Sequence, residues 1–273
     1  MTMAQDESLL QAALATRPRP AAPGAASHTF TFAWRALLKI KHGPEQWFDV
    51  IITPVMFTVM FTYIFGGALA GSTDDYLQFL LPGILAQTVM FTSIYTGITL
   101  NADISRGVFD RFKSMPIWRP APLVGAMVGD TIRYTVSSLI VFAIGLALGY
   151  RPESGVVGVV LAIVLLDLFA FGIGWIFTTL ALVVKSASSV MTLSWLVLMP
   201  LTFLSNIYVD PATMPGWLQW IVSVNPVALL VTAVRGIMAG TAGGADIAWA
   251  LLAPAVVVVI FAPLAMQLYR RER

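Results

Sequence analysis

Long stretches without a charged residue dominate this chain of 273 residues. The hydrocarbon core of a bilayer is about 30 Å thick, and a helix of roughly 20 apolar residues crosses it. Within lipid, the backbone N–H and C=O groups must bond inside their own segment, so such stretches have to be helical. The chain has seven apolar blocks, of which only the fourth carries a charge, at Asp167: 50–73, 76–102, 134–150, 154–184, 186–209, 211–234 and 247–269. The sequence therefore predicts an all-α polytopic membrane protein.

Composition excludes several other classes of protein. Apolar residues make up 58% of the chain and charged residues 11%, a balance that a soluble domain does not tolerate on its surface. The net charge of +2 is small and the basic residues are scattered, so no nucleic-acid partner is expected. The chain has no cysteine, which excludes disulfides and zinc–thiolate sites. Both histidines, His28 and His42, precede the first apolar block, so we expect no metal site and no catalytic residues within the bilayer.

The distribution of lysine and arginine predicts the topology. If six blocks cross and the N-terminus is cytoplasmic, thirteen basic residues lie in inner segments and two, Arg151 and Arg235, lie in outer segments, with Arg133 inside the third span. Such an excess is typical of cytoplasmic loops. We therefore expect six spans with both termini in the cytoplasm.

The block that stays on the outer side is 211–234. Two early prolines and the Asn225-Pro226 pair interrupt it, and if it crossed, the arginine-rich C-terminus would face outward. We expect an outer re-entrant helical hairpin over residues 210–236, between spans 5 and 6. Its candidate functional residues are Trp217, Trp220, Asn225 and Pro226.

The N-terminal region divides into two parts. Residues 1–27 are polar and proline-rich, which predicts a disordered cytoplasmic tail. From residue 28 to 43, Arg35 and Lys39 share one helical face while Phe30 and Trp34 lie on another, which predicts an N-terminal interfacial helix. It could be a simple anchor or also position the first span. Residues 28–273 then form a single transmembrane domain.

The longest inner loop, residues 103–119, mixes charges of both signs with aromatic residues. A short exposed helix of that kind is suited to dock into a groove of a soluble partner. The alternative is an ordinary basic loop that lies on anionic lipid headgroups. The candidate coupling residues are Arg106, Phe109, Asp110, Arg111, Phe112, Lys113 and Met115.

Three ionisable residues fall within the predicted spans. Asp130 and Arg133 are three residues apart, so they can pair along one helical face. Their role is either structural or in transmitting motion from the loop. Asp167 lies near the middle of span 4, where a charge is expensive and often functional. Helix packing and a proton relay both remain open for Asp167.

Polar and aromatic residues in spans 2 and 5 could line a path for a flat amphipathic molecule, because aromatic and Met surfaces adapt to varied shapes. The alternative is ordinary helix packing. These candidate residues are Gln87, Phe91, Tyr95, Met199, Phe203 and Asn206. The pairs Gly125/Gly129 and Gly145/Gly149 on span 3 are suited to close helix contact.

Several blocks resemble a known family. They are Gly107–Arg119 with Gly129-Asp130 and Arg133, Pro200–Asn206, Met214–Leu218, Asn225-Pro226 and Ala233–Gly236. From about residue 30 onward, the chain resembles the daunorubicin/doxorubicin-resistance permeases of the ABC type-2 exporter class. That resemblance implies a permease subunit in the bacterial plasma membrane, which exports amphipathic drugs or secondary metabolites and confers antibiotic resistance.

The resemblance also implies a division of labour between chains. Two permease subunits would pair with two copies of an ATP-binding cassette subunit, which would hold ATP and Mg. The loop 103–119 would be the coupling helix, and the hairpin would cap the pathway. No Gly-rich phosphate loop ending in Gly-Lys-Ser/Thr occurs in this chain, so ATP hydrolysis is expected on the separate subunit.

Three other functions are alternatives for a chain of this kind. A permease for a lipid or a lipid-linked glycan would share the same architecture. A proton-driven carrier using Asp167 would be expected to show internal repeats and several buried ionisable groups, which the sequence lacks. An intramembrane enzyme is least favoured, because neither Gly-x-Ser-x-Gly nor His-Glu-x-x-His occurs.

Overall fold

A computed structural model describes residues 24–41, 44–108, 118 and 120–271, without the side chains of 40–50 and of 270 and 271. Every regular element in these ranges is a helix, which confirms the all-α prediction. The elements are α2 (Ala25–Lys41), α3 (Pro44–Ala70), α4 (Thr73–Ser105), α6 (Ala121–Leu148), α7 (Gly155–Val183), α8 (Ala187–Phe203), the 3-10 helix η1 (Pro211–Thr213), α9 (Gly216–Val224), α10 (Pro226–Ala239) and α11 (Gly244–Arg271).

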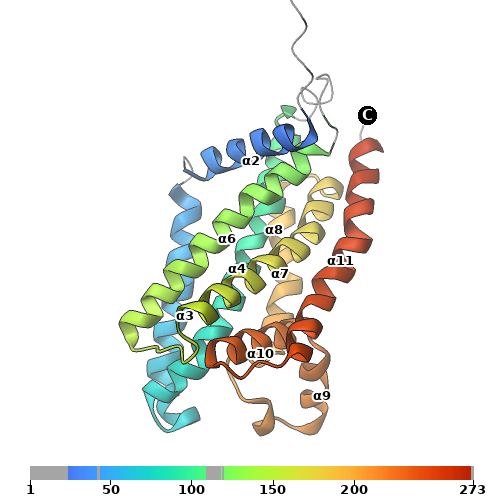
Figure 1. Cartoon of the computed structure of the whole chain (residues 1–273). Helices are drawn as coiled ribbons and strands as arrows, with labels where there is room; N and C mark the ends of the chain where they lie inside the picture. Colours follow the sequence, from blue (N-terminus) through green and yellow to red (C-terminus); the bar gives the residue numbers. More distant parts are fainter. Residues whose placement is uncertain (1–23, 42–43, 109–117, 119, 272–273) are drawn as a thin grey trace, which may run out of the picture.

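The long helices form an elongated bundle. Five of the described helices, α3, α4, α6, α7 and α11, are long and apolar enough to cross a membrane. Helix α8 has 17 residues and a length of about 25 Å at 1.5 Å per residue, so it is apolar but shorter than these five helices. In Figure 1 these helices run along the bundle, while α9 and α10 lie at the end opposite α2. The molecule is thus a multi-pass membrane protein.

Several boundaries differ from the sequence-based expectation. Helix α8 ends at Phe203, although the apolar block runs to 209, and the chain leaves the helix at Leu204, whose carbonyl oxygen accepts a hydrogen bond from the side chain of Asn225. Helix α10 continues past 236 to Ala239 and ends at Gly240, whose φ of +72° suits glycine. Residues 25–27, assigned to the tail, are helical and begin α2. The rest of that tail, 1–23, lies outside the described residues.

The loop assigned to 103–119 also begins later than expected. Residues 103–105 form the last turn of α4, and Arg106 is the residue that ends this helix. The apolar block ends at residue 102 because the next residue, Asp103, is charged. A helix can nevertheless continue into water beyond its apolar segment. The described part of the connection is therefore Arg106–Val108, Trp118 and Pro120.

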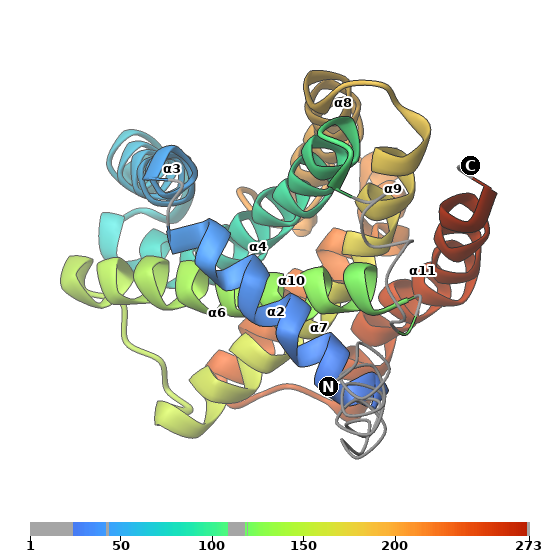
Figure 2. The ribbon, with the colours of Figure 1, turned by 90° about the horizontal axis from the view of Figure 1, so that it is seen from above.

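Helix α4 lies at the centre of the bundle. In its most apolar stretch 83% of the residues are buried, against 22% for α3 and 11% for α11. It contacts α3, α6, α7, α8 and α10, and Figure 2 shows it among them. Since α3 and α11 leave most of their apolar side chains exposed or only partly buried, they present the surface that lipid or a second protein would cover.

Helix α2 crosses one end of the bundle and packs on α6 (Figures 1 and 2). The contact is made backbone to backbone at two glycines of α6. A Cβ added to Gly125 would overlap the Cβ of Phe32, and one on Gly129 would lie 2.7 Å from the Cβ of Ala36. This small-xxx-small pair therefore permits the close helix contact that the sequence suggested.

Candidate functional site

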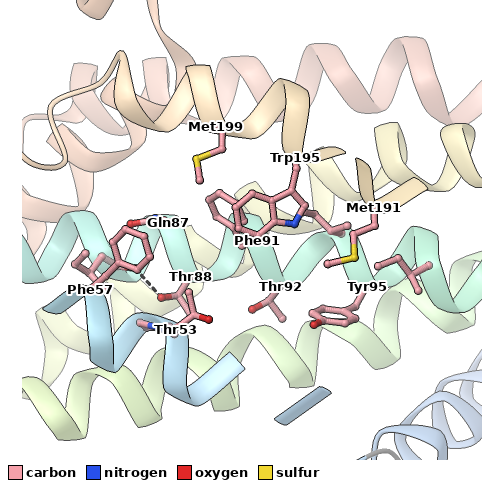
Figure 3. A pocket seen from close by; sticks show the side chains of 14 residues that line it. Thr53, Phe57, Gln87, Thr88, Phe91, Thr92, Tyr95, Met191, Trp195 and Met199 are labelled. Carbon is pink, nitrogen blue, oxygen red and sulfur yellow. Dashed lines mark hydrogen bonds between the residues drawn. The ribbon is translucent and has the colours of Figure 1, made fainter. Parts of the chain in front are cut away.

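A largely apolar pocket of about 170 Å³ lies between three helices (Figure 3). It is bordered by Thr53, Pro54 and Phe57 of α3, by Ile84, Gln87, Thr88, Phe91, Thr92, Ile94, Tyr95 and Ile98 of α4, and by Met191, Trp195 and Met199 of α8. None of these fourteen residues is charged. Four are aromatic and two are methionines, so the pocket offers polarisable surface to a ligand.

Four of the six residues predicted to line a path lie together in this pocket. Gln87, Phe91 and Tyr95 follow one face of α4, and Met199 faces them from α8. The other two do not line it. Phe203 is 51% exposed, and its ring lies 5.3 Å from that of Tyr208. Asn206 is buried elsewhere, with its amide nitrogen 2.8 Å from Thr232 Oγ1.

The end of α8 explains why Asn206 lies apart. Helical spacing would place it seven residues beyond Met199 on the same face, but the helix stops at Phe203. The backbone of Asn206 then turns toward α10, where its carbonyl oxygen accepts a hydrogen bond from Arg235 Nη2 at 3.0 Å. Periodicity predicts a common face only while the helix continues.

Several lining residues were missed by sequence reasoning. Met191 and Trp195 of α8 lie eight and four residues before Met199, a spacing that could have identified them. The ring of Trp195 meets that of Phe91 edge-on at a centroid distance of 4.7 Å. Nothing in the sequence indicated that α3 would supply Phe57 to the same wall.

Tyr208 lies beyond Gln87, toward the end of the bundle that carries α9 and α10. Its hydroxyl donates to Gln87 Oε1 at 2.6 Å, and its ring stacks on Phe61 at 4.5 Å. Its backbone oxygen accepts a hydrogen bond from the Tyr76 hydroxyl at 2.8 Å. Thr88, in contrast, bonds to Ile84 of its own helix at 2.7 Å. Gln87 therefore hydrogen-bonds to a residue outside its own helix, whereas Thr88 bonds within α4.

The four hairpin residues have different environments. Trp217 and Trp220 are 67% and 68% exposed on α9. Asn225 is buried at the junction between α9 and α10, which bend by 79° relative to each other. Pro226 is the first residue of α10, where its missing N–H costs no helical hydrogen bond.

The predicted intramembrane pair forms in the structure. Arg133 Nη2 lies 2.8 Å from Asp130 Oδ1, and both side chains are almost fully buried. The guanidinium of Arg133 also lies 5.8 Å from the ring centroid of Tyr95. Asp167 of α7 is half-buried and accepts a hydrogen bond from Thr135 of α6 at 2.6 Å.

A group of charges unforeseen in the sequence joins α2 to α4. Asp103 lies 3.3 Å from Arg35 Nη1 and also pairs with Lys39. Burial lowers the pKa of Lys39, an effect that the neighbouring Arg35 and Arg106 reinforce and Asp103 opposes. Of the candidate coupling residues only Arg106 is described; Phe109, Asp110, Arg111, Phe112, Lys113 and Met115 lie outside the described residues.

Metal binding has no visible basis in the described part of the chain. No group of three His, Asp or Glu side chains there is placed to hold a metal ion. The lining of the pocket offers a ligand apolar contact, the Gln87 amide and the hydroxyl groups of threonine and tyrosine.

Comparison with known proteins places the chain in a family. The family model for ABC-2 type transporters matches residues 27–239. The daunorubicin resistance ABC transporter permease protein DrrB1 of Streptomyces coeruleorubidus is 47% identical over 263 residues, 96% of this chain and 93% of that protein.

Two more distant relatives also carry the names of transport permeases. DrrC of Mycobacterium tuberculosis (strain ATCC 25618 / H37Rv), whose name refers to doxorubicin resistance, is 26% identical over 91% of this chain and 93% of its own length. The inner membrane transport permease YadH of Escherichia coli (strain K12) is 24% identical over 69% of this chain and 75% of its own length. The chain therefore belongs to the ABC-2 type transporter family, as a membrane permease subunit.

Proposed function

We propose that the chain is the permease subunit of an ATP-driven exporter of amphipathic drugs or secondary metabolites such as anthracyclines, and that it confers antibiotic resistance. The observation that carries this proposal is the uncharged aromatic and methionine pocket between α3, α4 and α8. The high identity to a daunorubicin resistance permease over 96% of the chain supports the same class of cargo.

The pocket suits a flat ring system with polar edges. Phe91 and Trp195 form an edge-to-face pair that can enclose a planar molecule by dispersion contacts. Met191 and Met199 have flexible thioether chains that accommodate different outlines. The Gln87 amide nitrogen would donate a hydrogen bond to a ligand oxygen, while its amide oxygen bonds to Tyr208.

Energy would come from a separate ATP-binding cassette subunit, which would hold ATP and Mg. Two copies of it would pair with a permease homodimer. The connection between α4 and α6, with Arg106 and the six coupling residues beyond it, would dock on that subunit. The end of α4 and the start of α6 lie at the end of the bundle that carries α2 and the C-terminal end of α11, which supports this arrangement (Figure 1).

The membrane would be the bacterial plasma membrane, with α2, Lys185 and both termini on the cytoplasmic side. In this orientation α2 would lie in the inner interface and α9–α10 would form the outer re-entrant hairpin. Arg151 and Arg235, the two basic residues assigned to outer segments, belong to the loop after α6 and to α10, at the end opposite α2, in support of this orientation.

The decisive experiment measures ATP-dependent uptake of a fluorescent anthracycline into inverted vesicles that contain this chain with its ATPase, and with either chain alone. Uptake should require both chains. Trp195→Ala should reduce the initial rate by about tenfold, since loss of one aromatic contact with the ligand costs on the order of 1–2 kcal/mol.

A matched variant controls for general damage. Trp249→Ala removes a tryptophan that is 57% exposed on α11 and does not line the pocket, so uptake should remain near wild type. Equal loss in both variants would argue against the pocket as the binding site. Uptake driven by a proton gradient without the ATPase would refute the proposed energy source.

A further inference from the structure

A second, smaller pocket lies at the other side of Tyr95, under α2. It has a volume of about 40 Å³ and is enclosed by α2, α4 and α6. Its lining differs in character from the apolar pocket, because five of its eleven residues are charged: Arg35, Lys39, Asp103, Asp130 and Arg133. Ion pairs within the cluster account for some of these charged groups, but not for all of them.

The unexplained part is Arg133. Its side chain is only 4% exposed, and its Nη2 group pairs with Asp130. Its Nε and Nη1 groups are buried and have no hydrogen-bond partner among the described residues. Buried donors are normally satisfied, so a guanidinium that lines a cavity with two unpaired groups indicates an acceptor in that cavity.

The charge balance indicates what the acceptor is. Three cations, Arg35, Lys39 and Arg133, line the pocket against two carboxylates, Asp103 and Asp130. Arg106 lies near enough to act on Lys39 as a further positive charge. A water molecule would satisfy the donors of Arg133 but would leave this excess of positive charge, whereas an anion satisfies both.

The position of the pocket indicates where the anion comes from. Helix α2, which covers the pocket, exposes Phe30 and Trp34 at 72% and 56%, as an amphipathic helix does when it lies among lipid headgroups. Arg35 and Lys39 are more than one-third exposed at the mouth, and Arg133 forms the buried end. The exposure of these cationic side chains therefore decreases from the level of the headgroups into the protein.

We propose that this pocket binds a phosphate group, either the phosphodiester of an anionic phospholipid headgroup or free inorganic phosphate, with Arg133 as its buried ligand. The site is separate from the apolar pocket and does not depend on which cargo is exported. Arg133 also touches Tyr95, which lines the apolar pocket, so an anion on Arg133 would lie one side chain away from that pocket.

The test uses the full chain purified in detergent. Native mass spectrometry would measure binding of phosphatidylglycerol and of diacylglycerol with the same acyl chains, and equilibrium dialysis would measure retention of radiolabelled inorganic phosphate. The variants are Arg133→Gln, which removes the ligand, and Asp130→Asn, which removes the competing carboxylate. Arg151→Gln is the control, because Arg151 is exposed at the opposite end of the bundle.

Opposite responses of the two variants are the critical expectation. Arg133→Gln should weaken binding by about tenfold or more, since one charged hydrogen-bonding partner is lost. Asp130→Asn should tighten binding, and Arg151→Gln should leave it unchanged. A purely structural Asp130–Arg133 pair predicts instead that both variants weaken binding, and that result would overturn the proposal.

The two probes distinguish the sources of the phosphate. Strong preference for phosphatidylglycerol over diacylglycerol, with no retention of inorganic phosphate, assigns the site to a lipid headgroup. Arg133-dependent retention of inorganic phosphate assigns it to a soluble anion. Equal binding of the two lipids with no retention of phosphate refutes the site.

Discussion

The side-chain amide of Asn225 donates a hydrogen bond to the backbone carbonyl of Leu204 at 2.6 Å, and a second one to Leu201 at 2.8 Å. These carbonyls belong to the end of α8, where no further helical N–H is available. The Asn225 side-chain oxygen accepts from Val227 N at 2.8 Å and so caps α10. One buried side chain thus completes the end of one helix and the start of another.

Replacing Asn225 by alanine should lower the free energy of unfolding by about 2–4 kcal/mol, because a cap and two buried hydrogen bonds are lost. Thermal unfolding of the purified chain in detergent measures this. Asn225→Asp keeps the cap acceptor of α10 but sets a buried carboxylate oxygen against the carbonyl oxygens of Leu201 and Leu204, so its effect should be at least as large. Ser223→Ala, on the exposed face of α9, is the control, and an equal effect there would contradict the assignment.

Gly125→Ala should destabilise the contact between α2 and α6. The added Cβ meets the backbone oxygen of Thr29 at 2.8 Å, and such overpacking costs about 1–3 kcal/mol. Gly67→Ala in α3 is a matched control, since nothing lies within 4 Å of its added Cβ. A drop in the unfolding temperature for Gly125→Ala alone is expected; equal values for both variants would show that α2 does not pack closely on α6.

The absence of cysteine allows the topology to be tested directly. Single cysteines at Lys185 and at Ala212, both exposed, introduce one thiol each into an otherwise thiol-free chain. A membrane-impermeant maleimide should label Ala212→Cys in intact cells and Lys185→Cys only in inverted vesicles. Labelling of both from one side would contradict the six-span arrangement.

Asp167→Asn should leave ATP-driven uptake within about twofold of wild type, a change on the scale of 0.5 kcal/mol. The amide oxygen of the asparagine can still accept the hydrogen bond from Thr135. Asp167→Leu removes that acceptor and should lower thermal stability instead. Complete loss of uptake in Asp167→Asn, with unchanged stability, would support the proton relay that the sequence left open.

The apolar blocks predicted most of the fold because charge is excluded from lipid wherever a helix crosses it. Residues 154–184 correspond to α7 within one residue at each end. The pairing of Asp130 with Arg133 was also predictable, since both lie on one face of one helix. These predictions needed only local spacing.

Contacts between distant segments were not predictable in the same way. Asp103 and Lys39 are 64 residues apart, and their pairing depends on where α2 crosses the bundle. The early end of α8 depends on Asn225, 21 residues beyond Leu204. For that reason the sequence grouped Asn206 with Gln87 and Met199, and omitted Phe57 and Trp195 from the pocket.

The contact of α2 with the two glycines of α6 has a mechanical consequence. Because the backbones touch there, and Asp103 holds α2 to the last turn of α4, α2 is attached to both helices that flank the α4–α6 connection. Two residues of chain separate α2 from α3, and α3 carries Thr53 and Phe57 in the wall of the apolar pocket. We therefore expect a push on that connection to reach the pocket wall through α2.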